Sequence, residues 1–214
     1  MSDTGHDHVH PKDNSLDRLL FFSDGVFAIA ITLLSIELHP PHDWDGTAAM
    51  LWREGGPGFV AYALSFVVIG IFWNSHRRSF TQILRYSQGV FALNLLLLGA
   101  IALMPYMTNL LYLQGPNGEA FAIYLATVGL AGVFQGLMFG WAVFVSRSVD
   151  PAVHWSRRVT AMLAAGLLPG LISAASLFFY AYMKGGGPGW LPALCAAAAG
   201  VVIALRVAAE KRYG

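Results

Sequence analysis

The chain has 214 residues, of which 56% are hydrophobic and 12% are charged. Soluble domains carry about 25% charged residues, and a globule of this length cannot bury so much apolar surface, so an integral membrane protein is indicated. The lone cysteine, Cys195, excludes an intrachain disulfide. The formal net charge of +1 is uninformative by itself, and we expect no nucleic-acid partner and no cofactor.

Apolar windows of about 20 residues, the length that crosses a bilayer as a helix, predict six membrane-spanning helices. These spans lie at 18–39, 57–76, 88–113, 118–145, 159–182 and 188–209. Short polar or Gly/Pro-rich connections separate them, as is typical of turns. The predicted fold class is therefore an all-α integral membrane protein. It would have a polar tail (1–17), a six-helix domain (18–209) and a short C-terminus (210–214).

Lysine and arginine are distributed unevenly between the two sides of this arrangement. With six spans both termini share one side, and eleven of the 13 Lys and Arg residues fall on it. Arg53 and Lys184 fall on the other side. Because cytoplasmic loops carry the excess of basic residues, we expect a multi-pass protein of the cytoplasmic membrane with both termini in the cytoplasm.

Other local patterns give weaker indications. The tail sequence HDHVH at 6–10 could hold a transition metal through its imidazoles, but a mobile polar tail is the simpler interpretation, and we expect no metal site. The sequence TVGL at 127–130 matches the start of the potassium-filter loop T-V-G-Y-G, yet it lacks the Tyr-Gly and lies within an apolar helix. No metalloprotease, nucleophile-elbow or phosphate-loop motif occurs, so an enzyme is not expected.

The first predicted helix has two distinct faces. At 100° per residue, one stripe lies within about 60° of Ile29; it holds Phe22, Gly25, Thr32, Leu33 and Ile36. Asp24 lies about 140° from Ile29 on this wheel. A carboxylate at membrane depth needs a partner, and Arg18 lies too far round the helix to form an i,i+4 pair with it.

The partner of Asp24 should therefore come from another helix or subunit. Candidates on the second and third helices are Trp73, Asn74, His76 and Asn94. We favour a role for Asp24 in holding helices together over a role in coordinating ions. The stripe around Ile29 is then the better candidate for a functional surface.

The residues of this helix also resemble a known family. The pattern R-x-x-x-F-S-D from Arg18 to Asp24, followed by GVFAIAITLL at 25–34, resembles the signature of the lysosomal potassium channel family and its prokaryotic relatives. The segments SFVVIGIFWNSHRRSF (65–80) and NLLLLGAIALMP (94–105) are similar to that family's W-x-x-H and N…P segments. The resemblance covers roughly residues 15 to 110.

This resemblance implies a homotetramer of six-helix subunits around one central pore, lined by the first helices and lacking the usual potassium filter. It places an aliphatic constriction at Ile29, with further pore-facing positions at Thr32, Leu33 and Ile36. The family's network that holds the first helix corresponds to Arg18, Ser23, Asp24, Trp73 and His76, to which we add Phe22 and Asn94. Eukaryotic members carry two such units per chain, whereas this chain carries one.

The expected function is a potassium-selective, or weakly selective, cation channel whose partners are further copies of itself, the lipid bilayer and the permeant potassium ion. A hydrophobic constriction can gate such a pore by dewetting. The alternative is a proton channel or proton-coupled transporter in which Asp24, Glu37 and His76 relay protons. A third possibility is a non-conducting membrane scaffold.

Overall fold

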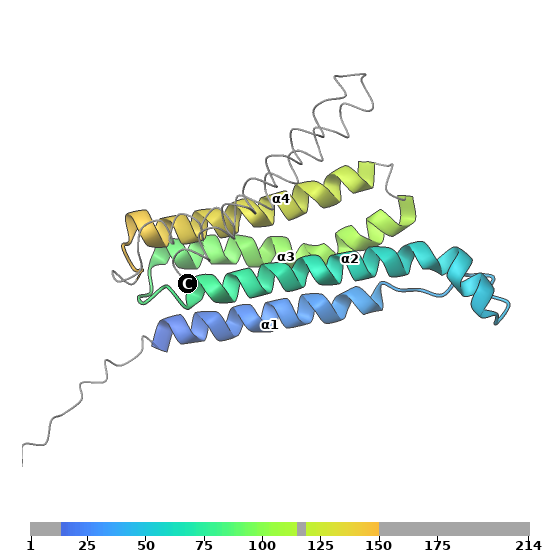
Figure 1. The fold of residues 1–214 in the computed structure, drawn as a ribbon, viewed down its shortest axis with the longest axis horizontal. Coiled ribbons are helices and arrows are strands. Elements are labelled where there is room, and N and C mark those ends of the chain that lie inside the picture. The colour runs from blue at the N-terminus through green and yellow to red at the C-terminus, as the bar shows by residue number, and fades with distance from the viewer. Residues whose placement is uncertain (1–13, 115–118, 150–214) are drawn as a thin grey trace, which may run out of the picture.

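The protein is described by a computed structural model over residues 14–114 and 119–149. These residues form four α helices, α1 (Asn14–Ile36), α2 (Ala48–Phe80), α3 (Gln88–Gln114) and α4 (Glu119–Gly140), and a π-helical turn, Trp141–Val145, extends α4. The helices run side by side along one long axis (Figure 1). All four are long and apolar enough to cross a membrane. The predicted spans 159–182 and 188–209 and the HDHVH tail lie outside the described residues.

The helix bounds differ most from prediction in α2. It has 33 residues and is about 50 Å long at 1.5 Å per residue, which exceeds the hydrocarbon core of about 30 Å. Thr47 caps its first turn by accepting a backbone hydrogen bond. The helix then continues through Pro57, where the predicted span began. A Cβ on Gly58 would lie 3.1 Å from the Tyr112 ring. The Gly/Pro-rich stretch of α2 therefore packs closely against α3.

The other bounds follow the prediction more closely. The third span and the combined α4 and π-turn match within one residue. Helix α1 begins at Asn14, before the predicted start at residue 18, and ends at Ile36. Its first turn is polar, so a hydropathy window does not detect it, although nothing prevents a helix from extending beyond the bilayer.

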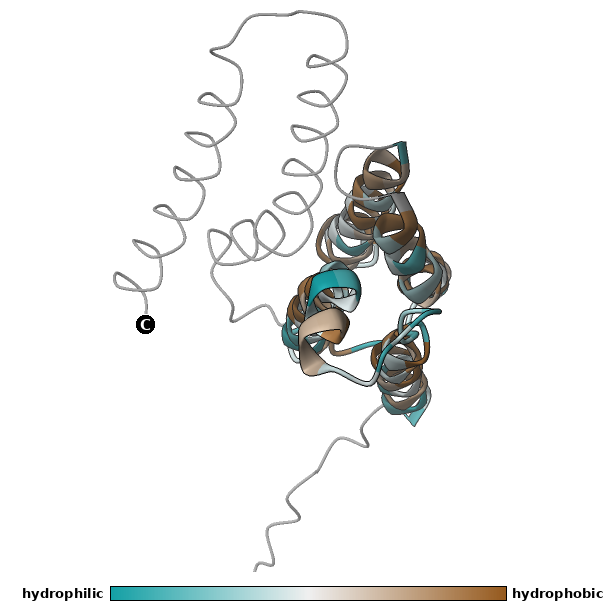
Figure 2. Cartoon of the chain, turned by 90° about the vertical axis from the view of Figure 1, so that its right-hand side faces the viewer, coloured by the Kyte–Doolittle hydropathy of each residue, from teal (hydrophilic) through white to brown (hydrophobic). Residues whose placement is uncertain are grey.

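Packing within the described part of the chain centres on α3, which contacts α1, α2 and α4. The larger apolar cluster includes side chains that are fully buried, among them Phe27, Ile69, Leu97, Ile101 and Met104. A smaller cluster gathers around Val90, Met138 and Phe139. Apolar residues are nevertheless visible on every helix in Figure 2, and large exposed ones occur on all four, so each helix keeps apolar surface that the described part of the chain does not cover.

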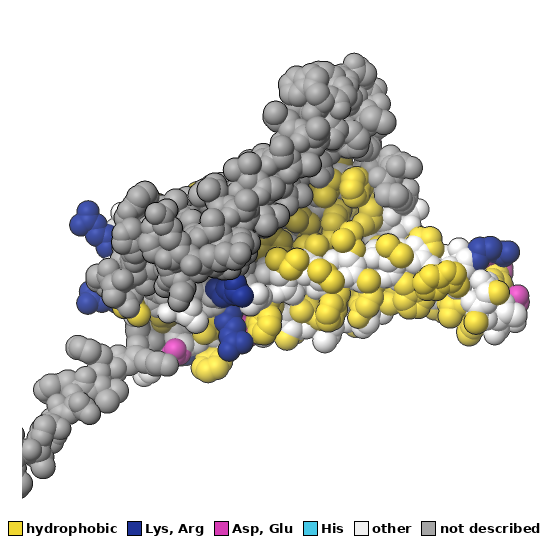
Figure 3. Space-filling view, in the orientation of Figure 1, with side chains coloured by type: hydrophobic (Ala, Val, Ile, Leu, Met, Phe, Trp, Pro, Cys, Tyr) yellow, Lys and Arg dark blue, Asp and Glu magenta, His cyan; other side chains and the backbone are white. Residues whose placement is uncertain are grey.

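Charged side chains gather at the two ends of the helices, and apolar side chains cover the surface between them (Figure 3). One end, here called the basic end, carries Arg18, Arg77, Arg78, Arg85 and Arg147. The opposite end, here called the acidic end, carries Glu37, Asp43, Asp45, Glu54 and Glu119. Among the described residues, Arg53 is the one basic side chain (Lys or Arg) at the acidic end. This asymmetry is the pattern expected of a helix bundle oriented across a membrane.

Candidate pore-lining face and its polar anchor

One face of α1 is buried against the other helices and the opposite one is exposed. The buried residues are Leu19, Ser23, Phe27, Ala30 and Leu34, whose spacing of three and four places them on one side of the helix. On the other side Ile29, Leu33 and Ile36 are 60%, 39% and 65% exposed. An apolar face of this kind must meet lipid or another subunit. The structure thus leaves the stripe around Ile29 available to line a pore.

The hydroxyl of Thr32 is exposed on this face. It donates a hydrogen bond to the Ile29 carbonyl at 2.9 Å, which is the back-bonded state common for threonine in helices. Because the proton points back to the helix, the lone pairs of the oxygen remain free to accept from, or coordinate, a group outside α1. Back-bonding and a pore-facing oxygen are therefore compatible here, although the sequence suggested them as alternatives.

Asp24 is anchored by the second helix. The indole Nε1 of Trp73 donates a hydrogen bond to Asp24 Oδ1 at 2.8 Å. The guanidinium of Arg77 lies over the same indole, 5.8 Å from the ring centroid, within the range of a cation–π contact. The carboxylate thus fixes α1 to α2 through a neutral donor.

A second, fully buried set of hydrogen bonds joins three helices. Asn94 of α3 donates through Nδ2 to Ser23 Oγ at 2.9 Å, and its Oδ1 lies 2.8 Å from His76 Nε2. An amide oxygen can only accept, so His76 Nε2 carries the proton. Ser23 in turn donates to the Leu19 carbonyl at 2.8 Å. All three side chains are 0% exposed, so we call Ser23, His76 and Asn94 the buried anchor.

The structure does not bring every residue of the expected network into these contacts. Arg18 and Phe22 are exposed. Within the described part of the chain, the one salt bridge joins Arg53 to Glu54, so Arg18 does not pair with Asp24. Between residues 14 and 149, excluding the gap at 115–118, no group of His, Cys, Asp or Glu is arranged to hold a metal.

Three polar contacts were not predicted from the sequence. The Thr108 hydroxyl lies 2.7 Å from that of Ser65, which lies 3.1 Å from the Tyr124 hydroxyl. At the acidic end Asn109 Nδ2 donates to Glu37 Oε2. Lone polar residues inside apolar spans were the available signal, but it does not identify which of them meet. The TVGL segment is helical, and Thr127 donates to the Ile123 carbonyl, so it forms no filter loop.

Comparison with known proteins finds the family that the sequence motifs resemble. Residues 18–105 match the family model of the endosomal/lysosomal potassium channel TMEM175. A potassium channel of Streptomyces collinus is 41% identical over 132 residues, which cover 58% of this chain but only 63% of that protein. An endosomal/lysosomal proton channel TMEM175 of Bos taurus is 29% identical over 181 residues, covering 78% of this chain and 37% of that one.

A solved structure is similar over more of its length. The crystal structure of a lysosomal potassium-selective channel TMEM175 homologue from Chamaesiphon minutus superposes with a TM-score of 0.66 at 26% identity, covering 90% of this chain and 97% of that one. Long apolar helices joined by buried polar contacts define an α-helical, membrane-spanning protein. The region that matches the TMEM175 family model runs from Arg18 through most of α3. The family resemblance predicted from the sequence is thereby confirmed.

Proposed function

We propose that the chain forms a potassium-selective, or weakly selective, cation channel and is not an enzyme. The observation that carries this proposal is the exposed stripe of Ile29, Leu33 and Ile36 on α1, with the Thr32 oxygen beside it. The relative from Streptomyces collinus is named a potassium channel, and the similar structure from Chamaesiphon minutus is titled potassium-selective. Both names support potassium as the permeant ion.

The conducting unit would be a homotetramer of six-helix subunits with α1 innermost. One exposed stripe per chain is too little wall to enclose a conduit, and closed rotational symmetry is the usual way for copies to share one. The anchors on Asp24 and Ser23 lie away from the stripe and would hold α1 against its own subunit while the stripe faces the axis. The basic end would face the cytoplasm, with both termini there, in the cytoplasmic membrane.

The stripe suggests how ions would be controlled. Four Ile29 side chains on the axis would close the pore to water, and such an aliphatic ring opposes the passage of hydrated ions. One turn along, Thr32 would offer four oxygens whose protons are donated back to the helix. These oxygens could replace part of the hydration shell as an ion passes the constriction.

A proton channel is the second candidate function, favoured by the name of the Bos taurus relative. The described contacts support it less. Asp24 meets an indole N–H, which can donate but cannot accept a proton. Within residues 14–114 and 119–149, the second ring nitrogen of His76 is buried without a partner. Glu37 lies thirteen residues beyond Asp24, about 20 Å along the helix, and bonds to Asn109.

Reversal potentials of purified protein in planar bilayers separate these functions. With potassium and proton gradients opposed, a potassium channel should reverse near the potassium equilibrium potential and a proton channel near that of the proton. A scaffold should give no current at any gradient. A reversal potential that follows pH and ignores potassium would overturn the proposal.

Replacing Thr32 tests the role of its hydroxyl in selectivity. Thr32→Ala should still conduct but should shift the potassium–sodium bi-ionic reversal potential towards zero, because four oxygens are lost beside the constriction. Thr32→Ser keeps the oxygen and should keep most of the selectivity. Ser35→Ala is the matched control, since its hydroxyl also bonds back to the helix, at 2.7 Å from the Thr32 carbonyl, but lies off the stripe. A wild-type reversal potential in Thr32→Ala would show that Thr32 only packs.

A further inference from the structure

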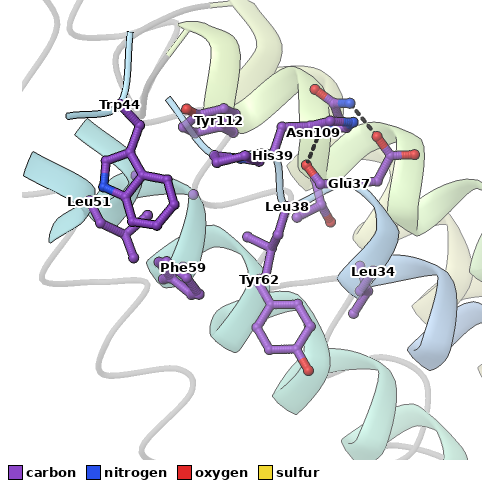
Figure 4. A pocket seen from close by; sticks show the side chains of 14 residues that line it. Leu34, Glu37, Leu38, His39, Trp44, Leu51, Phe59, Tyr62, Asn109 and Tyr112 are labelled. Atoms are coloured by element: carbon purple, nitrogen blue, oxygen red, sulfur yellow. Dashed lines mark hydrogen bonds between the residues drawn. The ribbon is translucent and has the colours of Figure 1, made fainter. Parts of the chain in front are cut away.

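A pocket of about 250 Å³ lies at the acidic end, away from the exposed stripe of α1. The end of α1 and the loop after it, the start of α2 and the end of α3 surround it (Figure 4). Its aromatic lining residues are Trp44, Phe59, Tyr62 and Tyr112. The volume is slightly below the range of drug-sized sites and suits a small organic molecule.

A carboxylate lies at one side of this pocket. Asn109 donates to Glu37 Oε2, and the backbone carbonyl of Glu37 lies 3.0 Å from His39 Nδ1 (Figure 4). Within the described part of the chain no lysine or arginine pairs with Glu37. Among the described residues its carboxylate is therefore oriented by an amide and is not neutralised by a cation, and charge of the opposite sign would stabilise it.

The surroundings add to this negative potential. Asp43 and Asp45 lie on the same end, whereas the charge of Glu54 there is already offset by Arg53 at 3.1 Å. The Thr47 hydroxyl donates to Asp45 Oδ1 at 2.6 Å, and this hydrogen bond lowers the pKa of Asp45, so that carboxylate keeps its charge. A cluster of like charge around a concave site raises the local concentration of cations.

The aromatic side chains that line the pocket favour organic cations over metal ions. Aromatic faces attract ammonium groups and also bury the apolar part of a ligand. Trp44 is held in place, since its Nε1 donates to the Thr47 carbonyl at 2.9 Å. A bare metal ion would instead need several oxygen or nitrogen ligands, and no such group occurs among the described residues. An anion would be repelled by Glu37.

From this combination we propose that the pocket binds an organic ammonium cation with a small apolar body, its charge against Glu37 and its methyl or methylene groups against the aromatic side chains. The proposal concerns a ligand site outside the conduction path. It does not depend on which ion the protein conducts.

Choline and its neutral isostere 3,3-dimethylbutan-1-ol test the proposal, because they differ in charge and hardly in shape. Saturation-transfer difference NMR on full-length protein in a neutral maltoside detergent gives both dissociation constants. We expect choline to bind with a dissociation constant on the order of millimolar and the isostere at least about tenfold more weakly. Equal binding of the two, or no binding of choline at 100-fold excess over that constant, roughly 100 mM, would overturn the proposal.

Three variants locate the site. Glu37→Gln keeps size and hydrogen bonding but removes the charge, and it should weaken choline binding at least about fivefold. Phe59→Leu keeps an apolar wall but removes the ring, and it should weaken choline about two- to fivefold without changing the isostere. Glu54→Gln is the matched control, a carboxylate at the same end already paired with Arg53, and should change neither ligand.

The outcomes remain interpretable if one variant is unstable. Elution volume and melting temperature of each variant are compared with wild type first, and Phe59→Leu carries the test if Glu37→Gln fails to fold. If Glu54→Gln weakens choline as much as Glu37→Gln does, only the general surface potential attracts the cation and the pocket assignment is wrong. Because the experiment measures ligand binding, a negative result would leave the channel proposal unaffected. Conversely, an absence of conductance would leave the proposal of a ligand site unaffected.

Discussion

Replacing Ile29 with serine is expected to raise the basal potassium conductance about tenfold or more. Ile29 is 60% exposed in the subunit, and in the proposed tetramer its four copies meet on the axis and exclude water. A small hydroxylated side chain widens the constriction and lets water remain. Lowering the barrier by only about 1.4 kcal/mol gives a tenfold larger rate. This energy is no larger than the free energy gained by burying an isoleucine side chain.

The matched control for this result is Ile71→Ser. Ile71 is also an isoleucine, is 58% exposed and lies on α2, so it should face lipid in the assembly and leave the current unchanged. Single-channel recordings in planar bilayers provide the measurement, with the current normalised to the number of channels. If Leu33→Ser or Ile36→Ser raises the conductance while Ile29→Ser does not, the gate lies elsewhere on the same helix.

Asn94→Leu should destabilise the protein by about 2–3 kcal/mol, because two buried polar side chains lose the hydrogen bonds that they make with Asn94. Ser23 on α1 and His76 on α2 are both 0% exposed and both bond to Asn94. Polar contacts between membrane helices often contribute less than this. Here one amide bonds to two other helices and all three side chains are fully buried, so the larger value is expected. Loss of the tetramer and of current should accompany the loss of stability.

Asn74→Leu is the control for this substitution. Asn74 lies on α2 and is exposed, and it makes no hydrogen bond with a described residue, so its change in stability should stay within about 0.5 kcal/mol. Thermal unfolding in detergent and size-exclusion chromatography report stability and assembly together. A stable, tetrameric Asn94→Leu protein with altered ion selectivity would mean that Asn94 serves the pore and not the anchor.

The sequence predicted the positions of the four described helices because hydropathy measures what a bilayer requires of each segment. The largest difference is at the start of α2, because the predicted span began at Pro57 whereas the helix begins at Ala48. The helix persists there because Thr47 caps it and Tyr112 packs against Gly58. Both reasons lie in contacts that a local window does not include.

The candidate site was predicted in part. Helical geometry alone separated the stripe around Ile29 from the face that carries Asp24, and the structure exposes Ile29, Leu33 and Ile36. Geometry on one helix could not choose among four possible partners for Asp24, because that choice depends on how α2 is rotated. It also gave no indication that Glu37 meets Asn109, since those residues are 72 positions apart.

Cadmium block of an Ile36→Cys variant tests most directly whether α1 lines a pore shared by several subunits. The lone native cysteine is first removed as Cys195→Ala, and Ile71→Cys in the same background is the control. Thiolates bind soft metal ions, and several of them around one ion bind far more tightly than one. We predict that micromolar cadmium reversibly blocks the potassium current of Ile36→Cys and leaves that of Ile71→Cys unchanged. Block of Ile71→Cys with no effect on Ile36→Cys would contradict the account.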